Sequence, residues 1–305
     1  MPFIEATNVV KEYSGHRALD NFCLNVDEGS IYGLLGPNGA GKSTFIRILN
    51  QITAPDSGEI IFDGHVLRRD DISQIGYLPE ERGLYPKMKV GEQAVYLARL
   101  KGLSRYDAIK RLKMWFEKFE IESWWDKKLN TLSKGMQQKV QFITTVLHEP
   151  KLLIFDEPFS GFDPINTELL KHEIIQLKEN GATVLFSTHN MSSVEEICDN
   201  ITLLNKSRNI LTGKVSDIKE QFKQNDFSVR FKGSVDSIKH LPITIEEHNT
   251  TGNQTSAKLH FDNTLKSNDV LRQILDCVEV ISFEELLPSM NSIFIKVVED
   301  NNNAK

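Results

Sequence analysis

A glycine-rich segment near the N-terminus has the residue types needed to bind phosphate. Residues 36–44 are Gly-Pro-Asn-Gly-Ala-Gly-Lys-Ser-Thr, which matches the phosphate-loop pattern G-x-x-x-x-G-K-[ST]. Glycine lets the backbone turn so that several N–H groups point into one hollow, and a helix that starts there adds partial positive charge. The apolar residues 31–35 favour a buried strand before the loop, and residues 44–49 favour a helix after it.

This strand–loop–helix context makes an ordinary glycine turn a poor alternative explanation. Lys42 would reach the β- and γ-phosphates of a nucleotide, and the Ser43 hydroxyl would bind Mg²⁺. The residues expected to contact the nucleotide here are Gly36, Asn38, Gly39, Ala40, Gly41, Lys42, Ser43 and Thr44.

Two later strands also end in residues suited to phosphate chemistry. The apolar residues 152–155 are followed by Asp156 and Glu157, and the run at 183–186 leads to His189. The carboxyl ends of parallel strands meet at one edge of a sheet, where ligands bind in α/β proteins. Asp156 would help to hold Mg²⁺, Glu157 would act as general base on an attacking water, and His189 would reach the γ-phosphate. Taken singly, Glu157 fits an ordinary turn and His189 fits a packing residue, so the inference depends on the phosphate loop.

The composition is that of a globular protein without a dedicated nucleic-acid surface. Charged residues make up 26% of the chain and hydrophobic residues 40%. The net charge of -6 does not point to a basic face, although it leaves room for a local basic patch. The three cysteines lie far apart and form no C-x-x-C pair, which favours a reducing compartment. No signal sequence or membrane-spanning apolar run is evident. We therefore expect a cytoplasmic protein that meets the inner face of the cell membrane only through a partner, and no nucleic-acid partner.

Strands and helices alternate through the first two thirds of the chain. This alternation predicts an α/β fold with a parallel sheet covered by helices on both faces. A helical region spans about residues 90–119 and is broken near residues 102–104. We expect a nucleotide-binding domain over residues 1–213, with a helical subdomain at about 85–145, and then a linker at 214–224.

The pattern changes after Gly213 to that of a small α+β domain over residues 225–299. Its elements follow the order β-α-β-β-α-β, which is ferredoxin-like, and the Asn-rich residues 300–305 are expected to be a disordered tail. No catalytic cluster is evident in this domain, which favours a regulatory or dimer-supporting role. The expected elements are strand 227–232, helix 235–241, strand 243–247, hairpin loop 249–254, strand 256–261, helix 268–277 and strand 278–283.

The order of these motifs resembles that of ATP-binding cassette (ABC) ATPases across residues 3–213. The resemblance implies a P-loop NTPase fold with ATP and Mg²⁺ as cofactors, in which Tyr13 stacks on adenine and residues 36–44 form the Walker A loop. Residues 152–157 then correspond to the Walker B strand and its catalytic glutamate. The catalytic residues implied in this way are Lys42, Glu157 and His189, the last as the switch histidine.

Part of the resemblance concerns a site that two subunits would share. Residues 132–136 resemble the ABC signature loop, in which Ser133 and Gly135 contact phosphate, and residues 160–163 resemble the D-loop. In this family two cassettes meet head to tail, so each ATP lies between Walker A of one subunit and the signature of the other. The resemblance therefore implies a dimer with a second ABC ATPase subunit, identical or related, and a separate membrane permease that the pair drives.

Three positions depart from the usual pattern of the family. Glu80 stands where Gln is usual, and its carboxylate would offer an oxygen to Mg²⁺ or to water. Lys134 and Met136 replace the commoner Gly and Gln of the signature, and Gly-Phe at 161–162 replaces Ala-Leu in the D-loop. The string at residues 79–85, the Lys-Gly-Met signature and the small C-terminal domain resemble ATPase subunits of bacterial sodium-export and drug-export systems.

The resemblance thus predicts an ATP-hydrolysing subunit of an efflux transporter. The alternative is a soluble ABC ATPase that acts on ribosomes or DNA. Translation-type members usually carry two cassettes, and repair-type members need a long coiled coil for which the segment between Lys42 and Ser133 is too short. A GTPase is disfavoured because residues 205–208 lack the aspartate of N-K-x-D. Candidates for permease contact, or else for the ATPase core, are Leu84, Tyr85, Met88, Val90 and Tyr96.

Overall fold

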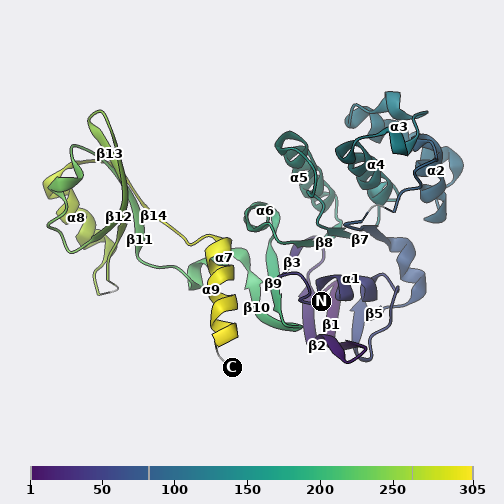
Figure 1. The fold of residues 1–305 in the computed structure, drawn as a ribbon, viewed down its shortest axis with the longest axis horizontal. Coiled ribbons are helices and arrows are strands. Elements are labelled where there is room, and N and C mark those ends of the chain that lie inside the picture. Colours follow the sequence, from purple (N-terminus) through teal and green to yellow (C-terminus); the bar gives the residue numbers. More distant parts are fainter. Residues whose placement is uncertain (1, 82, 263, 304–305) are drawn as a thin grey trace. The chain divides into compact units, whose positions relative to one another are not determined.

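The computed structural model describes residues 2–81, 83–262 and 264–303. The chain divides into two compact units (Figure 1). One is built from the chain up to Val215 together with the chain from Val297 onward, and the other is Ser216–Lys296. From the sequence, the first boundary was expected at residue 213.

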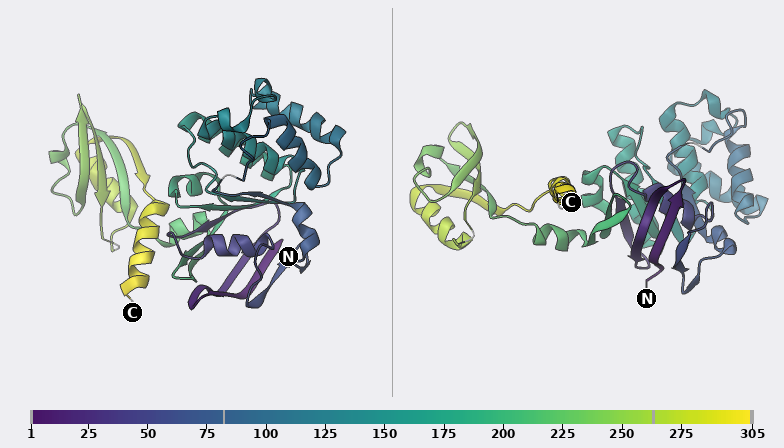
Figure 2. Two further views of the ribbon diagram at one scale, coloured as in Figure 1. Left: turned by 45° about the vertical axis from the view of Figure 1, so that its right-hand side comes forward. Right: turned by 60° about the horizontal axis from the view of Figure 1, so that its bottom comes forward.

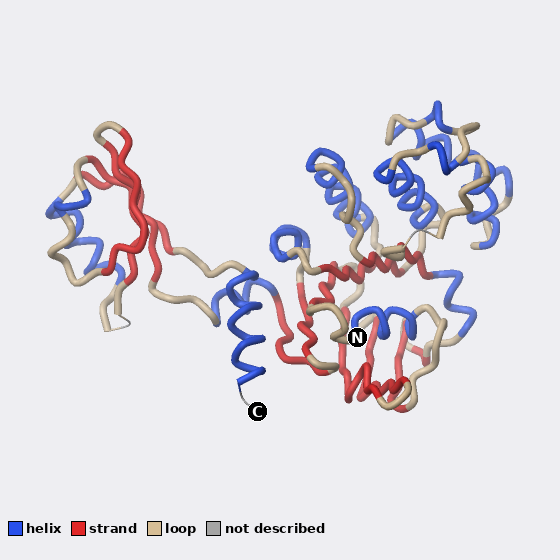
Figure 3. The backbone as a smooth tube through the Cα atoms, viewed as in Figure 1, coloured by secondary structure: helices blue, strands red, loops and turns tan. Residues whose placement is uncertain are grey.

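A six-stranded sheet forms the centre of the first unit (Figure 3). Its order is β10-β9-β3-β8-β7-β6, and all neighbours are parallel except β10, which is antiparallel to β9. Strands β3, β7 and β8 are buried along their whole lengths, as expected for apolar strands covered on both faces. The bounds are β3 Ile31–Leu35, β6 Ile75–Leu78, β7 Leu152–Asp156, β8 Thr183–Thr188, β9 Asn200–Asn205 and β10 Arg208–Lys214.

A second, antiparallel sheet has the order β2-β1-β4-β5. Helix α1 (Lys42–Leu49) packs between the two sheets, because its apolar side chains join one buried cluster with residues of both (Figure 2). The rings of Phe22 on β2 and Phe45 on α1 are 4.6 Å apart. The bounds are β1 Ile4–Tyr13, β2 His16–Val26, β4 Ser57–Phe62 and β5 His65–Val66.

Helices α2, α3 and α4 form the expected helical subdomain (Figure 1). The predicted break near residues 102–104 is confirmed, since Ser104 ends the gap and caps α3 by accepting the Asp107 N–H. On α4, Phe142 stacks on Phe155 of β7 with 5.6 Å between ring centroids, which joins the subdomain to the central sheet. The bounds are α2 Val90–Leu100, α3 Arg105–Lys118 and α4 Lys134–Val146, with short 3₁₀ turns at Glu122–Trp124 and Leu129–Thr131.

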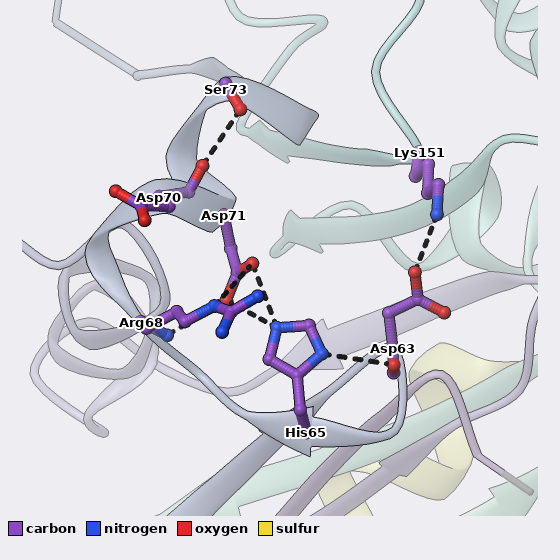
Figure 4. A network of polar contacts seen from close by, with 7 residues as sticks. All are labelled: Asp63, His65, Arg68, Asp70, Asp71, Ser73 and Lys151. Carbon is purple, nitrogen blue, oxygen red and sulfur yellow. Dashed lines mark hydrogen bonds and ion pairs between the residues drawn. The ribbon is translucent and has the colours of Figure 1, made fainter.

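A polar network fixes the segment that leads into β6 (Figure 4). The buried Asp71, in the 3₁₀ helix η1 (Arg69–Gln74), accepts hydrogen bonds from His65 Nε2 at 3.0 Å and from the Arg68 N–H at 2.9 Å. Asp63 pairs with Lys151 at 2.6 Å, next to the start of β7. The Asp71 contacts hold the segment that leads into β6, whose carboxyl end leads to Glu80, whereas the Asp63–Lys151 pair lies on the surface.

Helices α5 (Pro164–Glu179) and α6 (Met191–Ile197) follow β7 and β8 and complete the α/β alternation. Asp163 caps α5 by accepting the Asn166 N–H at 3.0 Å, and Phe159 packs on Phe186 of β8. The expected α/β fold class is therefore confirmed.

The second unit has a four-stranded antiparallel sheet of order β12-β13-β11-β14, with α8 (Ser267–Cys277) on one face (Figure 3). This order is that of the expected ferredoxin-like fold. The structure differs at two points: the helix expected at 235–241 is a 3₁₀ turn, Val235–Ser237, and the loop expected at 249–254 shrinks to Gly252-Asn253 because both strands extend. The bounds are β11 Asp226–Lys232, β12 Thr244–Thr251, β13 Gln254–His260 and β14 Glu279–Glu285.

Two helices lie at the boundaries between the units. Helix α7 (Val215–Gln221) follows β10, and α9 (Met290–Asn303) ends the described chain. Helix α9 continues through Asn303, whereas a disordered tail was expected from residue 300, and Asn301 accepts a hydrogen bond from Asn205 at 3.1 Å. Among the described residues, no helix is long and apolar enough to cross a membrane.

Gly91, the second residue of α2, should be needed for packing of the helical subdomain. A Cβ at this position would lie 2.7 Å from Nε1 of Trp125 and closer still to Cε2 and Cδ2 of the same ring. We expect Gly91→Ala to destabilise the protein by about 1–3 kcal/mol, as overpacking does, measured by urea unfolding. The matched control is Gly135→Ala, the second residue of α4, where an added Cβ would meet its nearest neighbour at an ordinary 3.7 Å. Equal stability of the two variants would contradict this account.

Candidate active site

A cavity of about 350 Å³ opens where the phosphate loop meets the carboxyl ends of β3, β6, β7 and β8. The order of these parallel strands brings their ends to one edge of the sheet, as expected. Most of the site residues expected from the sequence meet here. Those that line the cavity are Tyr13, Asn38, Gly39, Ala40, Gly41, Lys42, Ser43, Thr44, Glu80, Asp156, Glu157 and His189.

Three further residues line the same cavity and were not expected from the sequence: His16, Ala18 and Arg47. A two-residue Ser-Gly turn after Tyr13 is a hairpin signal that would have placed His16 opposite Tyr13. Arg47 lies four residues after Ser43 on α1, so helical periodicity puts both on one face. Both residues could have been found from the sequence if the hairpin after Tyr13 and the helix after the loop had been used to place them.

The backbone of the phosphate loop is held by close packing at two glycines. A Cβ on Gly36, which has φ 146°, would collide with the carbonyl oxygen of Leu204, and one on Gly41, with φ 115°, would collide with that of Ala18. Gly36 therefore supports the loop from outside and is not among the residues that line the cavity. Gly41 lines the cavity and also packs against a neighbouring segment at the start of α1.

Lys42 holds its ammonium group at the loop. Its Nζ donates hydrogen bonds to the carbonyl oxygens of Gly36 at 2.6 Å and Pro37 at 3.2 Å, and the residue is only 8% exposed. Burial lowers the pKa of Lys42, while the carboxylates of Glu157, Asp156 and Glu80 act in the opposite direction. A buried, hydrogen-bonded ammonium beside the loop is placed to pair with phosphate oxygens.

Glu157 is held in a defined orientation by three hydrogen bonds. Its Oε1 accepts from the His189 N–H at 2.9 Å and from His189 Nδ1 at 2.6 Å, and its Oε2 accepts from Thr188 Oγ1 at 3.1 Å. The Glu157 side chain is 14% exposed and that of His189 is 74% exposed. Glu157 and His189, expected from the sequence as base and switch residue, are therefore hydrogen-bonded to each other. Thr188, which was not expected, also binds Glu157.

The three carboxylates of the cavity have the chemistry of a site for a hard cation. Burial raises the pKa of Asp156, and the neighbouring Glu80 and Glu157 raise it further. Such excess negative potential, together with the Ser43 hydroxyl, fits Mg²⁺, which prefers oxygen ligands and usually keeps several waters. Across the described ranges no three acidic, His or Cys side chains are arranged to hold a metal ion.

The two signature residues lie outside this cavity. Ser133 caps α4 by accepting the Met136 N–H at 3.3 Å, and Gly135 follows in the first turn. Gln138, one turn later, donates to the carbonyl oxygen of Ser160. The start of α4 and the 160–163 segment thus lie together, away from the phosphate loop of the same chain.

A phosphate loop, together with a buried aspartate and an oriented glutamate at the carboxyl end of β7, defines a P-loop ATPase. Models of known families support this class: one described as ABC transporter matches residues 19–160, and one described as ATP-binding protein DrrA1-3-like, C-terminal domain, matches residues 213–298.

Known proteins and structures resemble the chain over most of its length. The uncharacterized ABC transporter ATP-binding protein YhaQ of Bacillus subtilis is 42% identical over 297 residues, with 95% of this chain and 97% of that protein covered. The linearmycin resistance ATP-binding protein LnrL of the same species is 32% identical, with 70% of each covered. A solved ATP-binding subunit of an ABC transporter gives a TM-score of 0.67 at 33% identity and covers 72% of this chain and 93% of that one. The chain belongs to the ATP-binding subunits of ABC transporters, which hydrolyse ATP to drive transport.

Lys42→Ala should remove most of the affinity for ATP. The variant loses the ammonium that pairs with phosphate while the loop backbone keeps its shape, so we expect Kd to rise at least about tenfold, or ~1.4 kcal/mol. Isothermal titration calorimetry with MgATP measures this, and circular dichroism checks folding. Lys151→Ala, which breaks an exposed ion pair outside the cavity, is the control and should bind as wild type. An unchanged Kd for Lys42→Ala would contradict the assignment of the loop.

Proposed function

We propose that the chain is the motor subunit of an efflux transporter, that it hydrolyses MgATP in a head-to-tail dimer, and that Glu157 is the general base. The observation that carries this proposal is the Glu157 carboxylate, held by His189 and Thr188 in the same cavity as Lys42. A carboxylate oriented in this way is suited to accept the proton of an attacking water. The cavity also has the loop N–H groups and the Lys42 ammonium group, both of which suit a phosphate.

Each residue then has a distinct task when ATP enters. The backbone of residues 38–43 and Lys42 hold the β- and γ-phosphates, and Tyr13 contacts the base. Ser43, Asp156 and Glu80 would hold Mg²⁺, which would neutralise charge on the phosphate oxygens. Glu157 accepts a proton from the attacking water. The water oxygen forms a bond to the γ-phosphorus, and the bond between the γ-phosphorus and the oxygen shared with the β-phosphate breaks. His189, bonded to Glu157, keeps the base in place and lies near the transferred group.

A second subunit is proposed because one chain supplies only part of the site. Ser133 and Gly135 begin α4, whose exposed N–H groups suit an anion, yet they are absent from the lining of this chain's cavity. In a head-to-tail pair each signature would face the γ-phosphate bound by the other subunit. Hydrolysis would then require both copies, whether identical or related.

Glu157→Gln should bind ATP but fail to hydrolyse it, and an ATP-bound dimer should accumulate. The amide cannot accept the proton of water, while the phosphate loop is unchanged, so we expect kcat to fall at least about 100-fold. Turnover is measured by phosphate release, and the dimer by light scattering after size-exclusion chromatography with ATP. The control Glu149→Gln alters a carboxylate that pairs with Arg111 outside the cavity and should retain turnover. Near wild-type turnover in Glu157→Gln would overturn the assignment of the base.

The surface proposed to receive a permease lies on the helical subdomain. Tyr85 and Tyr96 are exposed, with ring centroids 6.4 Å apart, and Leu100 is exposed nearby on α2. An adjoining cavity of about 290 Å³ includes Leu84 and His148 in its lining. Burial lowers the pKa of His148 to about 4, so its ring is uncharged at neutral pH. Of the residues named from the sequence, Val90 is fully buried and belongs to the core instead.

The efflux direction and the cytoplasmic location are inferred from relatives and from the chain itself. A relative named for linearmycin resistance covers most of the chain, and the second unit matches the C-terminal domain of DrrA-like proteins. The absence of a spanning helix among the described residues accords with attachment to the membrane through a partner. ATP supplied inside the cell then places the subunit on the cytoplasmic face.

Purification of tagged Glu157→Gln protein from its native cells would test the partner. In mild detergent with ATP, we expect a multi-spanning membrane protein to co-purify in stoichiometric amount. The same purification of a Tyr85→Asp/Tyr96→Asp double variant should lose that protein while retaining ATP binding, because two charges would enter an apolar contact. Recovery of ribosomes or DNA in place of a membrane protein would refute the transporter subunit and leave the ATPase assignment intact.

A further inference from the structure

The part of the cavity beside the β1–β2 hairpin is bordered by two rings. Tyr13 ends β1 and His16 begins β2, and the two residues pair directly across the Ser14-Gly15 turn. Residues directly opposite in an antiparallel pair project to the same face. Both line the cavity, whereas the phosphate loop lies between β3 and α1. The hairpin is therefore the structural element that would meet the nucleoside part of a bound nucleotide.

A lysine covers one face of the tyrosine ring. Lys11, two residues before Tyr13, has its Nζ 5.4 Å from the ring centroid, which is a cation–π distance. The same Nζ donates a hydrogen bond to Asp56 Oδ1 at 2.8 Å, and the Lys11 side chain is only 13% exposed. With an ammonium held against one face, a flat ligand can stack only on the other.

Asp56 holds both this lysine and the backbone that carries the tyrosine. Its Oδ2 accepts the Glu12 N–H at 2.6 Å, and its own N–H donates to the carbonyl oxygen of Val10 at 2.8 Å. The bonds from Lys11 and from the Glu12 N–H lower the pKa of Asp56, so the carboxylate is ionised at neutral pH. One side chain thereby fixes the end of β1 and the cation over Tyr13.

We propose that Lys11 and Asp56 are positioning residues for the nucleoside, which hold the free face of Tyr13 ready for a purine base, and that His16 contacts the same nucleoside. The proposal rests on the proposed function, since it takes the cavity to hold ATP. It divides recognition into two independent parts. The loop and Lys42 bind the triphosphate. Tyr13 and His16 bind the base and sugar, and the Lys11–Asp56 pair holds Tyr13 in place for this contact.

The experiment compares a ligand that has a base with one that lacks it. Calorimetry measures Kd for MgATP and for magnesium tripolyphosphate with wild type and Asp56→Asn. We expect the variant to bind ATP about five- to tenfold more weakly, the lower end of the range for one lost base stack, because Tyr13 loses its support. Tripolyphosphate affinity should stay within about twofold of wild type. Lys11→Met keeps the Asp56 bond to Glu12 and should show the same selective loss.

The control is a second exposed ion pair next to the same antiparallel sheet. Asp63→Asn removes the contact to Lys151 at 2.6 Å (Figure 4) and should leave both affinities as in wild type. Equal losses for ATP and tripolyphosphate in Asp56→Asn would assign the pair a general structural role and overturn the proposal, and so would unchanged affinity for both. A wild-type protein that binds neither ligand would instead refute the proposed function.

His16 is tested separately with the same two ligands. His16→Ala should weaken ATP by about fivefold and leave tripolyphosphate unchanged, because only the contact with the nucleoside is removed. Equal ATP affinity in His16→Ala and wild type would remove His16 from the proposal. The exposed position of His16 in the hairpin makes loss of folding an unsuitable explanation for a selective effect.

Discussion

Close packing of the phosphate loop against two neighbouring segments is the constraint on which the site depends. The backbone at Gly36 touches the carbonyl oxygen of Leu204 at the end of β9, and that at Gly41 touches Ala18 on β2. The loop is thus clamped between the parallel and the antiparallel sheet, with α1 buried between them. A phosphate cradle of this shape exists only when both sheets are packed, so nucleotide binding and folding stabilise each other.

Charge inside the cavity complements a metal–nucleotide complex better than a nucleotide alone. Lys42 faces Glu80, Asp156 and Glu157, whose fields act on its pKa, and burial strengthens all of these interactions. The phosphates of a nucleotide in this cavity would be repelled by the three carboxylates, and a divalent cation would offset that repulsion. The glutamate at position 80, where related cassettes usually have an amide, increases that requirement for a cation.

Helix α4 links Ser133 to the strand that precedes Glu157. The start of this helix carries Ser133 and lies against the D-loop, while Phe142 farther along stacks on Phe155 of β7. The strand that precedes Glu157 and the helix that would face the ATP of a proposed partner are therefore packed on each other. In the proposed dimer, this packing would give a physical route between the two sites.

Sequence alone determined the phosphate loop, the acidic ends of the strands, the helical insertion and the order of the C-terminal elements. Each depends on local residue types and periodicity, which the chain carries at short range. The tertiary structure decided what distant segments do to one another. It placed Gly36 outside the cavity, buried Val90, joined Thr188 to Glu157, and separated Ser133 from the loop. Strand order and packing set these distances, and neither can be obtained from spacing along the chain.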